Sequence, residues 1–200
     1  MSSDERRDQI IGAAARVFGE RGYVGGTTDA IAREAGISQA YVVRMFGSKE
    51  KLFAAVGDYA SERVIINFRA AIAQFPPGAT SFQKQGFMAK AYADLLADRG
   101  LLLSLLQLFS QGHDPVFGPQ ARRCFLDVYR VVRDEAELGP EDATAFFSRG
   151  MLLTILTAMR MPDAIPTDAD AAEMLRTVAG TVEPQFVELM SHPPLPDARR

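Results

Sequence analysis

The sequence around Tyr41 gathers side chains that could hydrogen-bond to a nucleic-acid duplex. Gln39 could pair with adenine in the major groove, Ala40 could touch a thymine methyl, and Arg44 could take guanine or phosphate. Tyr41 could donate its hydroxyl to a phosphate. Lys49, with the backbone amides at the start of the next predicted helix, could hold another phosphate. These residue types indicate DNA recognition.

Residue types that could support catalysis do not converge. His113 and Asp114 are neighbours in a loop, but a serine or cysteine nucleophile would have to come from elsewhere. Cys124 is expected to be a small buried hydrophobe inside the following helix. His192 lies in the tail, and two histidines with one cysteine give no zinc-binding spacing. The glycines of residues 22–26 lack the strand and lysine of a phosphate-binding loop. We therefore expect no enzyme, no catalytic residue, no metal site and no cofactor.

The spacing of Ala32, Gly36 and Val42 predicts two short helices, which would position the residues expected to contact bases. A steep crossing needs a small residue on the first helix, a residue that tolerates positive φ in the turn, and a branched residue on the second helix. Ile31, Ala35 and Ile37 would complete the small core. The Ala-x3-Gly-x5-aliphatic pattern is typical of a helix-turn-helix, although similar pairs occur in helical proteins that never touch DNA.

Thr27 and Ser38 can accept hydrogen bonds from first-turn amides, so they are expected to cap the two helices and fix where each begins. The start of the second helix matters because that turn reaches the base edges. The expected DNA-binding residues are Thr27, Thr28, Ser38, Gln39, Ala40, Tyr41, Arg44 and Lys49.

Helical periodicity runs through almost the whole chain, and Gly and Pro residues separate the segments. We expect the first helix to end in a left-handed residue at Gly22 and the fourth to bend near Gly57. The expected helices span residues 4–21, 27–35, 38–46, 49–75, 80–98, 100–111, 115–137, 140–160 and 168–182, with a short piece after Pro184.

Composition fits a globular cytoplasmic protein. The 200 residues are 48% hydrophobic and 24% charged, and a single cysteine cannot form an intrachain disulfide. The N-terminal segment lacks a signal-peptide pattern, and the longest charge-free apolar stretches reach about ten residues, against roughly 20 for a membrane span. Residues 1–53 carry eight basic and seven acidic groups, whereas the rest carries 14 and 18. A near-neutral N-terminal segment can still bind DNA if a few of its cations face phosphates.

Residues 6 to about 56, roughly a quarter of the chain, resemble the N-terminal domain of TetR-family transcriptional repressors. The resemblance implies a dimeric, ligand-responsive DNA-binding protein whose C-terminal part is helical. It is carried by Ile10, Ile11, Ala14, Phe18, Gly22, Tyr23, Thr27, Ile31, Ala32, Ala35, Gly36, Ile37, Ser38, Phe46, Lys49, Glu50 and Leu52.

Two positions depart from the family pattern. Val43 stands where the family usually has a tyrosine that holds phosphate, and Tyr41 is the residue that could partly replace it. Ala30 stands where an acidic residue would complete a capping box with the threonine cap. Val43 therefore keeps an alternative open, namely a helical ligand-binding or scaffold protein whose helix-turn-helix no longer reads DNA.

The C-terminal part offers a dimerisation surface. Residues 150–159 read GMLLTILTAM without a charge, so this helix is expected to be buried on both sides. We expect it and the final helix to pair with their copies in a four-helix bundle; a monomer's central core helix is the alternative. The expected dimer residues are Phe146, Gly150, Leu153, Thr157, Met174, Leu175 and Val178.

A ligand pocket in the central helices would be mostly apolar with a few polar groups. Aromatic residues and methionines at helical spacing are more often core than pocket, but Tyr92, Gln107, His113 and Tyr129 could be polar handles. The absence of charge in residues 101–109 disfavours a strongly charged ligand. The expected ligand residues are Phe68, Met88, Tyr92, Gln107, Phe109, Phe125 and Tyr129.

Together these features predict an all-α fold. A three-helix helix-turn-helix DNA-binding domain (residues 1–53) precedes a larger helical regulatory and dimerisation domain (residues 54–200). The predicted function is a homodimeric, sequence-specific transcriptional regulator, a repressor released from a palindromic operator by a small, largely apolar ligand. The helix that begins at Lys49 is expected to link the two parts and to couple ligand binding to DNA affinity.

Overall fold

The computed structural model describes residues 2–96 and 98–180. Within these ranges the chain is helical and contains no strand, so the expected all-α fold is confirmed. No helix in the described ranges is long and apolar enough to cross a membrane. The α-helices are α1 (Ser3–Gly25), α2 (Thr28–Glu34), α3 (Gln39–Phe46), α4 (Lys49–Ile72), α5 (Ser81–Leu96), α6 (Arg99–Ser110), α7 (Gly118–Arg130), α8 (Gly139–Ala158) and α9 (Ala169–Ala179). A π-helical turn, η1 (Val131–Glu135), and a 3-10 turn, η2 (Met161–Ala164), complete them.

Short polar side chains set where the first helices begin. Thr27 accepts a hydrogen bond from the amide of Ala30 at 3.1 Å, and Ser38 accepts one from the amide of Tyr41 at 3.3 Å. The predicted starts of α2 and α3 are therefore confirmed. Ala30 offers α2 no capping box, as expected, but α1 has one that the sequence analysis missed, between Ser2 and Glu5.

The end of α1 differs from the prediction. Gly22 has the expected positive φ, +68°, but its ψ of 175° only interrupts the helix, which resumes until Gly25. This break turns Tyr23 back onto the aromatic ring of Phe53 in α4, with 4.9 Å between the ring centroids. The C-terminal turn of α1 is therefore part of the packing between α1 and α4.

The helix α4 is continuous through Gly57, where the sequence predicts a bend. A Cβ at residue 57 would lie 2.6 Å from Cδ2 of Leu108, so this glycine makes room for α6. The predicted domain boundary after Phe53 falls inside this continuous helix. The Phe53 ring also packs against the ring of Phe117, just before α7, with 5.1 Å between the ring centroids. The division into residues 1–53 and 54–200 stays a prediction.

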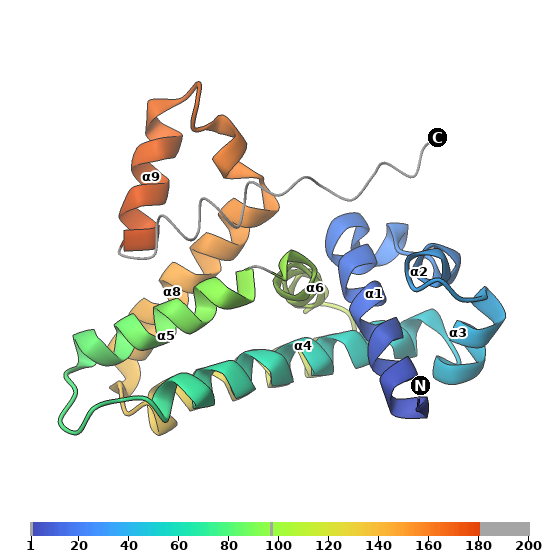
Figure 1. The fold of residues 1–200 in the computed structure, drawn as a ribbon, viewed down its shortest axis with the longest axis horizontal. Coiled ribbons are helices and arrows are strands. Elements are labelled where there is room, and N and C mark those ends of the chain that lie inside the picture. Colours follow the sequence, from blue (N-terminus) through green and yellow to red (C-terminus); the bar gives the residue numbers. More distant parts are fainter. Residues whose placement is uncertain (1, 97, 181–200) are drawn as a thin grey trace.

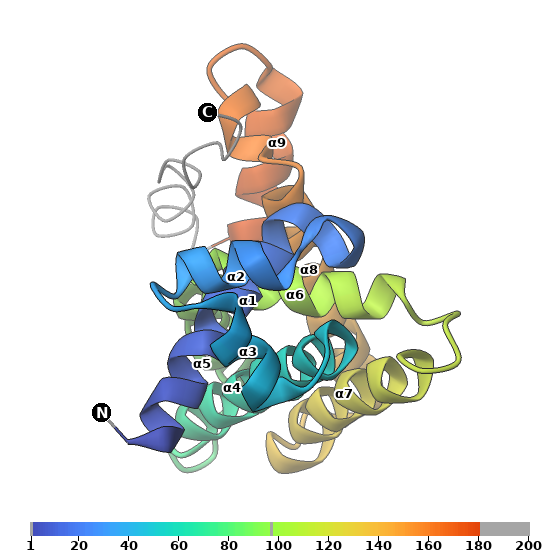
Figure 2. The same cartoon turned by 90° about the vertical axis from the view of Figure 1, so that its right-hand side faces the viewer.

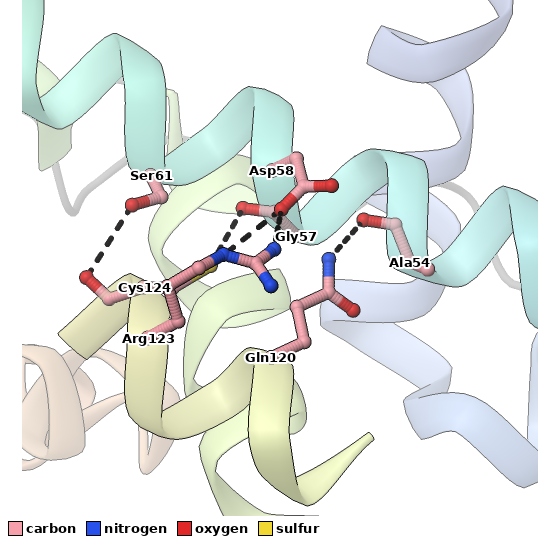
Figure 3. A network of polar contacts seen from close by, with 7 residues as sticks. All are labelled: Ala54, Gly57, Asp58, Ser61, Gln120, Arg123 and Cys124. Carbon is pink, nitrogen blue, oxygen red and sulfur yellow. Dashed lines mark hydrogen bonds and ion pairs between the residues drawn. The ribbon is translucent and has the colours of Figure 1, made fainter. Parts of the chain in front are cut away.

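A polar seam joins α4 to α7 (Figure 3). Gln120 donates to the carbonyl of Ala54 at 2.7 Å, and Arg123 forms an ion pair with Asp58 at 2.7 Å. Cys124 is buried between the two helices, and burial raises the pKa of its thiol. Cys124 is thus the small buried residue that the sequence analysis expected.

The segment predicted as one helix over residues 115–137 has a later start and an irregular end. The carboxylate of Asp114 accepts hydrogen bonds from the amides of Val116 and Phe117, so these residues form a capped turn before α7. The last turn is the π-helical η1, closed by the amide of Ala136 donating to Val131 O at 3.0 Å. The predicted extension of α9 to Val182, the piece after Pro184 and His192 lie outside the described residues.

Figure 1 shows α1 standing between the α2–α3 pair and α6, while α8 and α9 lie toward the opposite end. Figure 2 views the molecule from the α2–α3 side, with α4 and α7 running next to each other. α1 and α6 approach each other tightly at Gly19 and Gly100. A Cβ at residue 100 would lie 2.8 Å from the Cα of Arg16, and one at residue 19 would lie 2.9 Å from the carbonyl oxygen of Gly100. Side chains here would force the two backbones apart.

We expect Gly100→Ala to lower the free energy of unfolding by about 1–3 kcal/mol, the usual cost of overpacking a tight contact. Gly86→Ala in α5 is the matched control, because a Cβ there meets no atom within 4 Å. Replacing that exposed helical glycine should leave stability unchanged or raise it by up to about 1 kcal/mol. Urea denaturation measures both, and an unchanged Gly100→Ala variant would contradict the close crossing.

Candidate nucleic-acid interface

The crossing of α2 and α3 has the geometry that the sequence pattern predicts. Ala32 and Val42 are buried at the crossing. Gly36 has φ +66°, and a Cβ there would meet no neighbour within 4 Å, so backbone conformation is what calls for glycine. The amide of Ile37 donates to the carbonyl of Ala32 at 3.0 Å and closes the turn. These contacts hold α3 at a defined angle to α2.

One face of α3 is open to solvent, as a helix that enters a DNA groove requires. Gln39, Ala40, Val43 and Arg44 are exposed, and Tyr41 is half-buried. The opposite face packs into the core of α1, α2 and α4. The residues expected to read bases therefore lie on one accessible surface, which supports their proposed role.

Two contacts position the side chains that are expected to read bases. The guanidinium carbon of Arg44 lies 4.7 Å from the centroid of the Tyr41 ring, in a cation–π arrangement. The side-chain amide of Gln39 donates to Thr28 Oγ1 at 2.9 Å, which links the starts of α2 and α3. Its second N–H and its carbonyl oxygen are not used in this bond, so the amide can still pair with a base.

Lys49, which was expected to hold a phosphate, makes two contacts within the chain. Its ammonium group lies 4.6 Å from the centroid of the Tyr23 ring and donates to the carbonyl of Val24 at 3.2 Å. Tyr23 in turn donates its hydroxyl to Glu50 at 3.0 Å; burial and Glu50 raise the pKa of Tyr23 to about 12. Lys49 is half-buried, and one of its three ammonium hydrogens is taken by Val24.

Within the described part of the chain, few of the basic residues up to position 53 pair with a carboxylate. Arg16 and Arg33 form ion pairs with Glu34 and Asp29, at 2.8 and 3.0 Å. The other six basic residues up to position 53 are in no ion pair with a described residue. Among these, Arg7 was missed by the sequence analysis: its guanidinium lies 5.5 Å from the ring of Phe46, at the end of α3. No spacing rule links residues 7 and 46, so only the fold reveals this contact.

A separate apolar pocket lies between α4, α5, α6, α7 and α8. Four of the seven predicted ligand residues line it, namely Phe68, Tyr92, Phe109 and Phe125.

The other three predicted ligand residues lie elsewhere. Met88 is fully buried in the core. Gln107 faces α1. A Cβ added at Gly22 of α1 would lie 3.3 Å from the Oε1 atom of Gln107. Tyr129 packs against Phe147 outside the lining, and His113 is exposed. The helical period explains these misses, because residues on one helix face different neighbours.

Several predicted dimer residues are already used inside the chain. Phe146, Leu153, Thr157 and Leu175 are buried in its own core, so they cannot form a contact surface as placed. Gly150 and Val178 are half-buried, and Met174 is exposed. The large apolar side chains that remain exposed on α8 and just after it are Leu152, Ile155 and Met159, at 37%, 41% and 63%.

Comparison with known proteins links this geometry to a family. The family model for "Bacterial regulatory proteins, tetR family" matches residues 10–56. The HTH-type transcriptional activator FasR of Mycolicibacterium smegmatis is 38% identical over 69 residues, which are 34% of this chain and 32% of FasR. The HTH-type transcriptional repressor NicS of Pseudomonas putida is 41% identical over 54 residues, 27% of this chain and 26% of NicS.

Similarity in fold extends further along the chain. The crystal structure of the transcriptional regulator FadR from Bacillus subtilis, in complex with stearoyl-CoA, aligns with 92% of this chain and 96% of its own. The TM-score is 0.60 at 17% sequence identity, a likeness of fold alone. The matches to FasR and NicS span about a third or less of those relatives.

Removing the side-chain cap of α3 should destabilise the folded chain. We expect Ser38→Ala to lower the free energy of unfolding by about 0.5–2 kcal/mol, because the amide of Tyr41 loses its acceptor. Ser110→Ala is the control, since that hydroxyl donates to Gln107 O and caps no helix start. Chemical denaturation should show the control within about 0.5 kcal/mol of the parent. Equal effects of the two substitutions would contradict the cap.

Proposed function

Because this chain belongs to the TetR family of transcriptional regulators, we propose that it is a sequence-specific DNA-binding repressor that a small, largely apolar ligand releases from a palindromic operator. The observation that carries the proposal is the exposed face of α3, held by caps and a packed crossing. The relatives include an activator and a repressor, so the direction of regulation is tested separately, by transcription from a promoter that carries the operator.

The proposed reading residues are Gln39, Ala40 and Arg44, with Tyr41 and Arg7 toward phosphates. Gln39 and Arg44 are the side chains that discriminate bases by paired hydrogen bonds. Arg44 and Arg7 lie on aromatic rings of this region, so their cations are partly positioned before DNA arrives. The alternative, a scaffold whose helix-turn-helix has lost DNA binding, rests only on Val43. The family match and the exposed α3 favour the regulator.

The dimer is proposed to form through α8 and α9. Leu152, Ile155 and Met159 follow one another at helical spacing, and Met174 of α9 is also exposed. A row of exposed apolar side chains is a common feature of an interface between protein chains. A symmetric dimer would present two copies of α3 to two half-sites of one operator.

Coupling between ligand and DNA is proposed to pass through α6 as well as α4. Leu105 and Phe109 of α6 line the pocket, whereas Gly100 and Leu103 on another face of α6 approach Gly19 of α1. A ligand that moves α6 would therefore move α1, on which α2 packs. Linkage then requires operator DNA to weaken ligand binding by the same factor.

Arg44→Ala tests the reading face. We expect operator binding to weaken by about 1–3 kcal/mol if Arg44 meets a base, with a much smaller effect on random duplex. Arg63→Ala is the control, because it removes the same charge from an exposed arginine of α4, outside α2 and α3. Fluorescence anisotropy over a salt series measures both.

Three outcomes of this experiment can be told apart. An equal loss on operator and random duplex would assign Arg44 to phosphate contact. A parent protein without salt-dependent duplex binding would contradict the regulator and support the scaffold. An Arg63→Ala loss as large as that of Arg44→Ala would mean that net charge, not the α3 face, carries the binding.

The double substitution Ile155→Glu with Met159→Glu tests the dimer. The parent should have twice the 21.9 kDa chain mass, and the variant should fall toward one chain because buried unpaired carboxylates oppose association. Phe82→Glu is the control, since Phe82 is 83% exposed on α5, outside the proposed interface. Light scattering coupled to size exclusion measures the mass. A dimeric double variant would place the interface elsewhere.

A further inference from the structure

The apolar pocket between α4, α5, α6, α7 and α8 has polar side-chain groups at one place only. Two hydroxyls, those of Tyr92 in α5 and Thr154 in α8, are the only oxygen or nitrogen atoms that its described lining side chains contribute. The rest of the lining consists of aliphatic and aromatic side chains, methionine and a glycine, and five of the residues are phenylalanines. A ligand therefore meets one polar cluster in an otherwise apolar site.

This polar cluster consists of Tyr92, Thr154 and the carbonyl oxygen of Gly150. The Tyr92 hydroxyl lies within hydrogen-bond distance of the Gly150 oxygen at 2.9 Å, and the Thr154 hydroxyl lies 3.0 Å from the same oxygen. The two hydroxyl oxygens also lie close enough to each other for one to donate to the other instead. Each hydroxyl has one hydrogen, so both hydrogens have acceptors inside the cluster. What the cluster has left to offer a ligand is lone pairs on the hydroxyl oxygens.

The lining also lacks any charge. None of the residues around the pocket, all within the described ranges, is Asp, Glu, Lys, Arg or His. Burial raises the pKa of Tyr92 to about 12, so its hydroxyl stays neutral at physiological pH. An ionised ligand group would enter without a counter-charge, which is costly in an apolar site.

We infer that this pocket binds an uncharged, mainly apolar molecule with one hydrogen-bond donor, such as a phenol or an alcohol, and that the hydroxyls of Tyr92 and Thr154 accept that donor. The inference deepens the proposed function, on which it rests for the pocket being the effector site. A carboxylate would need a hydrogen that the cluster already uses, and an ammonium group would find no anion. The two hydroxyls are thus the specificity-determining groups.

Four ligands with the same 4-propylphenyl body test the inference: 4-propylphenol, 4-propyltoluene, 4-propylbenzoate and 4-propylbenzylammonium. Calorimetric titration of the full chain at pH 7 should show 4-propylphenol binding at least about 10-fold more tightly than either ion. Benzoate or benzylammonium binding as tightly as the phenol would overturn the inference, as would a lack of binding by all four.

Variants assign the preference to the hydroxyls. Tyr92→Phe with Thr154→Val should weaken 4-propylphenol by about 3- to 10-fold, the value of one or two neutral hydrogen bonds, and leave 4-propyltoluene unweakened. The single Tyr92→Phe variant, which keeps one acceptor, should lie between. Thr157→Val is the matched control, because this buried threonine bonds to Leu153 O outside the pocket. An unchanged phenol affinity in the folded double variant would contradict the assignment.

The same samples separate this inference from the proposed function. Operator affinity is measured by anisotropy with and without saturating 4-propylphenol. Phenol binding with the expected variant pattern, but no change in operator affinity, would uphold the pocket chemistry and reject the ligand-released repressor. Operator binding without the phenol preference would uphold DNA recognition and reject the inference.

Discussion

The contact between the backbones of α1 and α6 is the constraint on which the rest of the molecule depends. Gly19 and Gly100 allow the two helices to approach so closely that a single Cβ would force them apart. α2 packs on α1, and α3 packs on α2. α6 therefore acts on the direction in which the exposed face of α3 points through α1 and α2, while α4 contacts both α1 and α3 directly.

Two faces of α6 contact different parts of the molecule, namely the apolar pocket and α1. Residues 102, 105, 106 and 109 line the pocket, whereas residues 100, 103 and 107 approach α1. This division follows the helical period, which places residues three or four apart on one side. Packed interiors pass displacements on because they contain little free space. The proposed coupling would carry a change at the pocket to α1 through α6.

Electrostatics separates the two proposed sites more sharply than net charge suggests. The helix-turn-helix region carries cations that pair with no carboxylate among the described residues, and two of them lie over the rings of Tyr41 and Phe46. The pocket has no charged lining residue and one cluster of neutral hydroxyls. The two proposed partners, a polyanion and a neutral molecule, would thus bind to different surfaces of a chain whose formal charge is only −3.

The sequence by itself determined the features that depend on neighbouring residues: the caps at Thr27 and Ser38, the positive φ of Gly36, the α2–α3 crossing and the all-helical class. These depend on interactions within a few residues, which sequence spacing records. Only the tertiary structure decided which aromatic residues line the pocket, that Lys49 turns to Tyr23, and which residues of α8 stay exposed. Those outcomes depend on how each helix is rotated against partners distant in sequence, and helical periodicity alone does not specify that rotation.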